Sequence, residues 1–180
     1  QKNSMTLHVF NPEHDIALAY DNKYFTAPHA GRQLRNDLDY LPVLWAEEGD
    51  FVLVENVNSA QQHALRLQRY GKQVYFVNKD DVERLSKQID KVLPWGWDSS
   101  VKFQLKQMGV NGSVLPDDEV LADIRKLSNR QFSSDVLKEL QGCLNHPILL
   151  GEAFYVDSLS DLENILKEKG KIVIKAPWSS

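Results

Sequence analysis

The sequence has little cysteine and no long apolar run. Cys143 is the only cysteine, so an intrachain disulfide is excluded and a metal site built from several cysteines is not expected. No apolar stretch approaches the roughly 18 residues that a membrane-spanning helix requires. The first residues lack the long hydrophobic segment of a signal peptide. We therefore expect a soluble, cytoplasmic protein that has no membrane partner.

Positive charge is also limited. The chain has 21 Lys and Arg residues against 25 Asp and Glu residues, which gives a formal net charge of -4 at pH 7. A nucleic-acid-binding domain needs a basic stripe to contact phosphates, so we expect no nucleic-acid partner. A single nucleotide needs only a few well-placed cations and is not excluded. The length of 180 residues is enough for one full core and part of a second domain.

The first part of the chain has the pattern of an α/β fold. Three short runs rich in apolar and β-branched residues predict strands, at 6–10, 51–54 and 74–77. Helices are predicted between them, one starting near Pro28 and one over 58–69 that Gly71 ends. Alternating strands and helices favour right-handed crossovers and a parallel sheet. We therefore predict a Rossmann-like domain over residues 1–110.

Beyond Asp80 the pattern becomes mostly helical. Helices are predicted at 82–92, 101–108, 117–127 and 133–140, and Asp98 is predicted to cap the second of them. Residues 111–147 are interpreted as a helical linker, because Asn145-His146-Pro147 breaks the helical pattern. A separate unit is predicted over 148–180. It consists of a strand within 148–156, a helix over 158–169 that Gly170 ends, and a strand over 171–175.

The last ten residues, KIVIKAPWSS, place a lysine at the end of the last predicted strand. Lys175 there suits a phosphate as a point charge, although a strand-end lysine that extends to solvent is the alternative. The stretch FYVDSLSDLENILKEKGKIVIKAPWSS resembles the opening of an ATP-grasp domain. In that family a strand–helix–strand unit ends in a lysine, and a proline and a Ser/Gly-rich loop follow and cover the nucleotide phosphates. The family's pattern continues with glycines, and none follows Gly170 here.

The resemblance implies a role for the whole chain. Lys175, Ser179 and Ser180 would bind nucleotide, and the Rossmann-like domain would be the pre-ATP-grasp domain that shapes the acceptor-substrate site. The chain would then be the amino-terminal portion of an ATP-dependent ligase that joins a carboxylate to an amine or a thiol. ATP and Mg²⁺ are expected in the full-length protein, with the Mg²⁺ ligands beyond Ser180.

Further expectations follow from the same resemblance. This portion alone is expected to bind no cofactor and to be inactive, and its two final serines are expected to be poorly packed or held by a neighbouring molecule. The substrate would be a small carboxylate or amine. The resemblance identifies no catalytic residue and leaves homo-oligomer formation open.

Polar residues follow the first predicted strand, at the edge of the sheet where doubly wound folds bind ligands. The substrate-binding candidates in this segment are Asn11, Glu13, His14, Asp15, Arg32 and Arg35. Cations at a helix start oppose the helix dipole, so the two arginines are expected to meet an anionic ligand or an Asp/Glu partner. The alternative is that NPEHD opens a short helix over 16–20 and that the arginines are solvated. Because the spaced glycines of a dinucleotide site are lacking, NAD and FAD are not expected.

The turn PWGWD (94–98) holds two tryptophans around a glycine. We include Trp97 among the substrate-binding candidates as part of an aromatic platform, and the alternative is packing at an interdomain joint. No metal site is expected, because the histidines near the amino terminus lack ligand spacing. His8 is predicted to point inward with a hydrogen-bond partner. The alternative function is a non-catalytic Rossmann-like module that binds a small molecule or a protein.

Overall fold

The computed structural model describes residues 5–67, 69–144, 148 and 151–178. The chain divides into two compact units between Ala122 and Asp123, within helix α6 (Asp118–Leu127). Unit 1 is Gln1–Ala122 and unit 2 is Asp123–Ser180. The domain boundaries expected near residues 110 and 147 stay a prediction.

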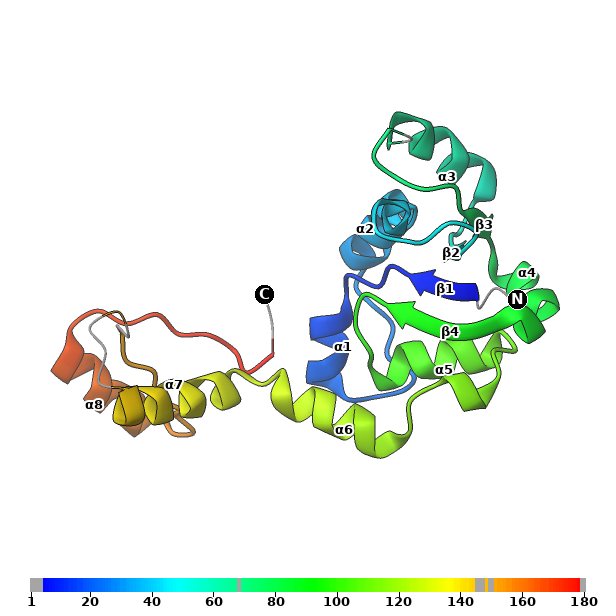
Figure 1. Cartoon of the computed structure of the whole chain (residues 1–180). Helices are drawn as coiled ribbons and strands as arrows, with labels where there is room; N and C mark the ends of the chain where they lie inside the picture. Colours follow the sequence, from blue (N-terminus) through cyan, green and yellow to red (C-terminus); the bar gives the residue numbers. More distant parts are fainter. Residues whose placement is uncertain (1–4, 68, 145–147, 149–150, 179–180) are drawn as a thin grey trace. The chain divides into compact units, whose positions relative to one another are not determined.

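Unit 1 is an α/β domain with a parallel sheet (Figure 1). Its described residues form four strands, β1 (Met5–Val9), β2 (Phe51–Leu53), β3 (Tyr75–Val77) and β4 (Ile89–Pro94). Their order is β3-β2-β1-β4, and every neighbouring pair is parallel. Strands β2 and β3 are added successively on one side of β1, and β4 is added on the other side. The order in which strands are added therefore reverses between β1 and β4, and we call this place the reversal point of the sheet. The Rossmann-like α/β class predicted from the sequence is consistent with this sheet.

Helices and short 3-10 turns connect the strands. Between β1 and β2 lie α1 (His14–Tyr20), α2 (His29–Leu38) and η1 (Leu41–Leu44). Between β2 and β3 lie α3 (Val57–Ala64) and η2 (Leu65–Leu67), and α4 (Lys79–Leu85) and η3 (Ser86–Gln88) precede β4. After β4 follow α5 (Ser99–Gln107) and η4 (Gly112–Val114).

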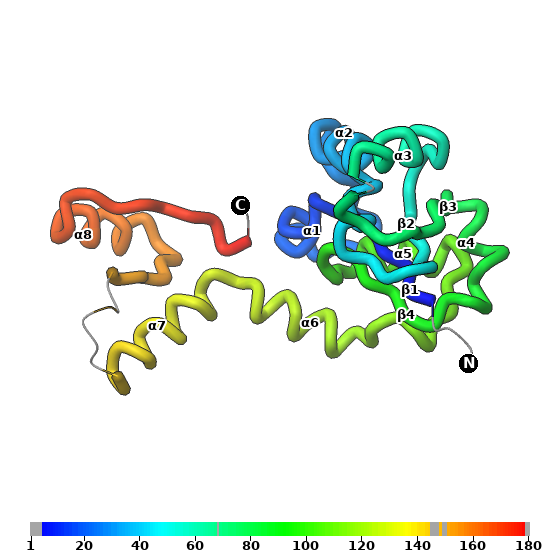
Figure 2. Tube along the Cα trace, turned by 45° about the horizontal axis from the view of Figure 1, so that its top comes forward, coloured from blue at the N-terminus to red at the C-terminus, as the bar shows by residue number. Residues whose placement is uncertain are grey.

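Both faces of the sheet are buried, as a parallel sheet requires. Because strand residues alternate between faces, Leu7 and Phe51 point to the side where they pack with Val82 of α4 and Leu105 of α5. On the other face Val52 packs with residues that include Ala46 and Ala60 of α3. Figure 2 shows α2 and α3 side by side, in agreement with Figure 1.

The helix predicted over 82–92 is wrong beyond Leu85. The chain forms η3 there and then strand β4, in which Ile89 pairs with Met5 and Val92 with Leu7. Val82, Leu85, Ile89 and Val92 are three to four residues apart, which is also helical spacing. Pairing with β1 buries Ile89 and Val92, and this tertiary contact overrides the local pattern.

The helices in the described part of unit 2 are the end of α6, α7 (Arg130–Leu144) and α8 (Leu159–Lys169). Ser158 caps α8 by accepting a hydrogen bond from the Asp161 amide. Gly170 ends the helix at a φ of 75°, as the sequence predicts. Among the described residues of this unit, neither 151–156 nor 171–175 forms a strand. Both strand predictions are therefore wrong for these residues, because a strand needs a hydrogen-bonded neighbour and the described part of unit 2 supplies none.

Candidate functional site

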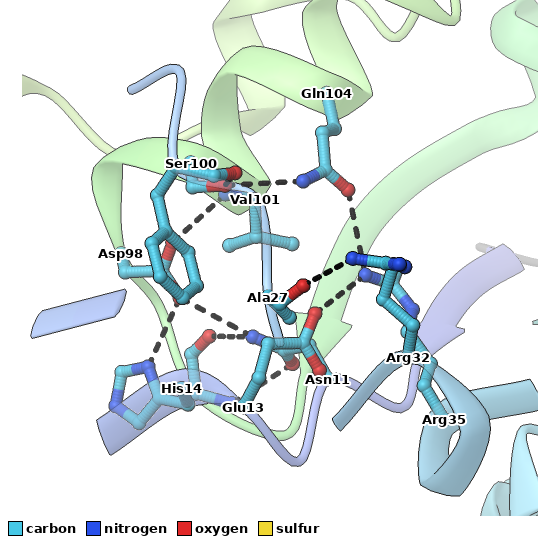
Figure 3. Close-up of polar contacts among 12 residues, drawn as sticks. Asn11, Glu13, His14, Ala27, Arg32, Arg35, Asp98, Ser100, Val101 and Gln104 are labelled. Carbon is cyan, nitrogen blue, oxygen red and sulfur yellow. Dashed lines mark hydrogen bonds and ion pairs between the residues drawn. The ribbon is translucent and has the colours of Figure 1, made fainter. Parts of the chain in front are cut away.

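The site begins where β1 and β4 end, at the reversal point of the sheet (Figure 3). The Asn11 side chain is buried there and joins the two strand ends. Its Nδ2 donates to the Gly96 carbonyl at 2.8 Å, and its Oδ1 accepts from the Gly96 amide at 3.3 Å. Both polar ends of this side chain are thus used to fix the 95–98 turn, so Asn11 positions the site.

The buried Asp98 carboxylate and the half-buried His14 ring form a polar pair beside Asn11. One Asp98 oxygen accepts from the Val101 amide at 2.9 Å and caps α5, and the other lies 3.2 Å from His14 Nδ1. The Gly96 backbone lies directly against the His14 ring: a Cβ at Gly96 would be 2.2 Å from His14 Cδ2. The capping role predicted for Asp98 is confirmed, and the glycine of PWGWD is explained by this close approach.

A cleft of about 390 Å³ opens at the carboxyl ends of β1, β2 and β3. Its walls come from the segments after these strands and from helices α2 and α5. The charged residues among its lining are Glu13, Arg32, Arg35, Asp39, Glu55 and Lys79. The lining also includes apolar side chains, among them Phe25, Leu53 and Met108, so the cleft suits a small molecule that has both charged and apolar parts.

Arg35 and Glu13 form an ion pair on the cleft wall. Arg35 Nη1 donates to Glu13 Oε1 at 2.8 Å and to Gln104 Oε1 at 3.4 Å. The pair joins α2 to the segment after β1. Arg35 lies in the last turn of α2, where the helix dipole favours a cation, so the dipole conflict argued from the sequence is wrong for this residue. The expected Asp/Glu partner of Arg35 is present.

The other oxygen of Glu13 is unusual. Oε2 is buried and has no hydrogen-bond partner among the described residues. The Glu13 side chain is 10% exposed. Because a buried carboxylate oxygen without a donor carries a desolvation cost, a donor from outside the described residues, a water or a bound molecule, is expected at this atom.

Within the described residues the Arg32 side chain makes one hydrogen bond, from Nη1 to the Ala27 carbonyl at 2.5 Å. A guanidinium carries five N–H donors in a fixed fork, so further donors remain beside the cleft. Arg32 therefore keeps the anion-binding capacity that the sequence predicts.

Asp39, Glu55 and Lys79 complete the charged lining and were not identified from the sequence. Asp39 Oδ2 accepts from the Glu55 amide at 2.7 Å. Burial raises the pKa of the Asp39 carboxyl above its usual range, although this backbone hydrogen bond opposes the shift. Glu55 and Lys79 lie two residues after the ends of β2 and β3. The rule that ligands bind at the carboxyl ends of parallel strands also indicates Glu55 and Lys79.

The remaining substrate-binding candidates lie apart from the cleft lining. Asp15 is exposed in the first turn of α1, where it complements the helix dipole, as the alternative reading of NPEHD expects. Trp97 packs against the core cluster of α4 and α5. Trp95 is exposed instead, with its ring centroid 5.8 Å from that of Phe10 and 6.0 Å from that of Trp45.

The predicted nucleotide-binding residues belong to unit 2. Lys175 is exposed, and Ser179 and Ser180 lie outside the described residues. The residues just before the serines are held within the unit. Arg130 donates to the Ala176 and Pro177 carbonyls at 2.9 and 3.0 Å, and Trp178 Nε1 donates to the Arg125 carbonyl at 2.9 Å.

His8 has the inward orientation and the partner that the sequence predicts. It is buried, and its Nε2 lies 2.9 Å from Asp50 Oδ2. Burial alone would raise the pKa of the Asp50 carboxyl. Hydrogen bonds from His8 and from the Thr6 and Glu47 amides outweigh it and hold this pKa below its usual range. The pair ties β1 to the start of β2 and lies outside the cleft lining.

Metal-ligating side chains do not gather in the part of the chain that the structure describes: no three His, Cys, Asp or Glu residues there are placed to share an ion. None of the helices in the described ranges has the length and apolar character needed to span a bilayer. No protein-family model matches the sequence, and neither the curated proteins nor the solved structures include a significant match.

Proposed function

We propose that this chain provides the acceptor-substrate pocket and a first nucleotide-binding segment of an ATP-grasp-type ligase, which joins a carboxylate to an amine or a thiol. The observation that carries the proposal is the cleft of unit 1. It lies at the carboxyl ends of three parallel strands, where α/β folds bind ligands, and its walls carry both cations and carboxylates. Its volume is in the range of small-molecule sites, about 300 to 1,000 Å³.

The nucleotide-binding part of the proposal is supported by the resemblance of residues 154–180 to the opening of an ATP-grasp domain. Contacts from Arg130 and Trp178 hold the backbone on both sides of Pro177, while the Lys175 side chain is exposed. An exposed ammonium on a fixed backbone is suited to contact phosphate oxygens. That residues 148–180 are the start of an ATP-grasp domain is itself part of the proposal.

In ligases of this type ATP supplies the phosphoryl group that activates the carboxylate as an acyl phosphate, which the acceptor then attacks. The contribution of this chain would be to position the reactants and to balance charge. Arg32 and the Glu13–Arg35 pair would orient the acceptor in the cleft, and Lys175 would contact phosphate. Since no three His, Cys, Asp or Glu residues in the described ranges are placed to share an ion, we assign no Mg²⁺ ligand to them.

The second candidate function is a small-molecule-binding module without catalysis. Two observations favour it: unit 1 has its own core and cleft, and residues 171–175 do not form the strand that the ATP-grasp motif requires. In this case the cleft would bind its ligand and Lys175 would have no role in binding.

Titration of Mg²⁺-ATP into the full-length protein and into its Lys175→Ala variant separates the two functions. We expect Lys175→Ala to weaken nucleotide binding about tenfold or more, because a charge-assisted hydrogen bond is lost. Lys171→Ala is the matched control, since Lys171 is an exposed lysine of the same segment, and it should bind as the parent does. Equal affinities for all three proteins would favour the binding module. ATP hydrolysis by residues 1–180 alone would contradict the expectation that this portion is inactive.

A further inference from the structure

The charges in the cleft are balanced. Three lining residues are cationic types and three are carboxylates: Arg32, Arg35, Lys79, Glu13, Asp39 and Glu55. A site for phosphate or another polyanion would carry a surplus of cations, because complementary potential selects the ligand. A balanced lining instead matches a molecule that carries both signs of charge.

Part of this charge is already used within the protein. Arg35 is paired with Glu13 Oε1, and the Asp39 carboxylate accepts the Glu55 amide. These contacts fix the two walls relative to each other. The groups with unused hydrogen-bonding capacity are therefore the ones that define the ligand.

Glu13 Oε2 is the buried acceptor of the lining that lacks a donor, and Arg32 keeps donors that no described residue uses. Glu55 and Lys79 also lack a side-chain partner among the described residues, but both are exposed, so solvent satisfies them. Oε2 is buried without a donor among the described residues, and a ligand ammonium would supply one together with the opposite charge. The Arg32 guanidinium uses one N–H for the Ala27 carbonyl, so its remaining donors suit a carboxylate in a bidentate pair. One position therefore requires a donor and the other an acceptor.

From this arrangement we infer that the cleft binds a small zwitterion, a free amino acid or a dipeptide, with its ammonium group at Glu13 and its carboxylate at Arg32. The inference rests on the proposed role of the cleft as the acceptor pocket and names the class of acceptor. A cleft of about 390 Å³ lies near the lower end of the small-molecule range, which suits one or two amino-acid residues.

The test is a binding screen on the full chain. The twenty free amino acids and a set of dipeptides are screened by thermal shift, and the tightest binder is measured by isothermal titration calorimetry. Its N-acetyl derivative, which lacks the ammonium, and its carboxamide, which lacks the carboxylate, are measured in parallel. We expect each derivative to bind about tenfold to a hundredfold more weakly than the parent compound, because each loses one charge-assisted contact.

Two substitutions assign the contacts. Glu13→Gln keeps an acceptor for Arg35 but places an amide donor at the Oε2 position. It should therefore weaken the binding of the parent compound and leave the affinity for the N-acetyl derivative nearly unchanged. Arg32→Gln should likewise weaken the binding of the parent compound and leave the affinity for the carboxamide nearly unchanged. Glu163→Gln and Arg66→Gln change exposed residues of the same types outside the cleft lining and should have no effect.

Two results would overturn the inference. One is that no amino acid or dipeptide binds, and the other is that the N-acetyl derivative or the carboxamide binds as tightly as the parent compound. The proposed ligase function is tested separately, by the effect of Lys175→Ala on nucleotide binding. A cleft that rejects zwitterions in a protein that uses Lys175 for ATP would overturn this inference alone.

Discussion

The two units differ in how they bury apolar side chains. Unit 1 buries both faces of a four-stranded sheet, with Leu7 and Val52 fully inaccessible. In unit 2 the only buried residue in the described ranges is Ser134, while Val173 and Ile174 are 82% and 70% exposed. Amphipathic helices bury their apolar faces only where another layer covers them. A paired sheet supplies that layer in unit 1, and this is also the unit that has the cleft.

The largest expected effect comes from the core of unit 1. Leu105→Ala removes a side chain that is 1% exposed and packs against the sheet, so it should lower the free energy of unfolding by about 2 to 5 kcal/mol. Leu166→Ala in α8 removes the same side chain at a position that is 46% exposed, and should cost less than about 1.5 kcal/mol. Urea unfolding followed by circular dichroism measures both. Equal losses would show that unit 2 has a core of its own.

The next effect compares the two helix caps. Asp98→Ala removes the cap of α5 together with the contacts that the buried Asp98 carboxylate makes with His14 and Asn11, so we expect a loss of about 2 to 4 kcal/mol. Ser158→Ala removes the exposed cap of α8 and should cost about 1 kcal/mol. Asp98→Asn, which keeps the cap acceptor, is the control and should lose less than Asp98→Ala. If Ser158→Ala cost as much as Asp98→Ala, the contribution assigned to the His14 and Asn11 contacts would be wrong.

A smaller effect tests the close packing at the reversal point of the sheet. Gly96→Ala places a methyl group within 2.2 Å of the His14 ring, which must move, at a cost of about 1 to 3 kcal/mol. Gly112→Ala is the matched control, since a Cβ there meets nothing within 4 Å, and it should change the unfolding free energy by less than about 1 kcal/mol. A neutral Gly96→Ala would mean that the His14 position is not fixed by this contact. The His14 ring resonances in NMR spectra would report the displacement directly.

The smallest effect is a pH dependence in unit 1. The pKa of the Asp50 carboxyl is lowered in the folded state, so its contribution to stability is fully present well above the unfolded pKa of about 3.9. This contribution is lost as the pH falls through the lower folded pKa. Asp50→Asn should therefore lose stability less steeply than the parent between pH 5 and pH 3, as measured by urea unfolding at each pH. Parallel curves would contradict the role assigned to the His8–Asp50 pair.

The sequence predicted the elements that local patterns determine. The sequence predicts strands β1, β2 and β3 and the cap at Asp98 because their signals lie within a few residues. Strand β4 was missed because its apolar spacing fits a helix, and only pairing with β1 decides between the two. The run Ile172-Val173-Ile174 was predicted as a strand on composition, but composition does not supply a partner strand.

The site was predicted in part for the same reason. Glu13 follows the first predicted strand and Arg35 belongs to the next predicted helix, and the structure pairs them. Asp39 lies in a connection, and its place in the cleft depends on a hydrogen bond to the backbone after β2, which no local pattern records. Trp97 was selected as an aromatic platform, whereas the core contact of this side chain depends on how α5 packs on the sheet.

The most direct test of the proposal that unit 2 contacts the nucleotide and unit 1 the acceptor is hydrogen–deuterium exchange of the full-length protein with and without Mg²⁺-ATP. The proposal predicts that nucleotide slows exchange in residues 171–178 of unit 2, and that this protection is lost in Lys175→Ala. Protection confined to unit 1, or equal protection in the parent protein and the variant, would contradict the assignment of the nucleotide to this segment.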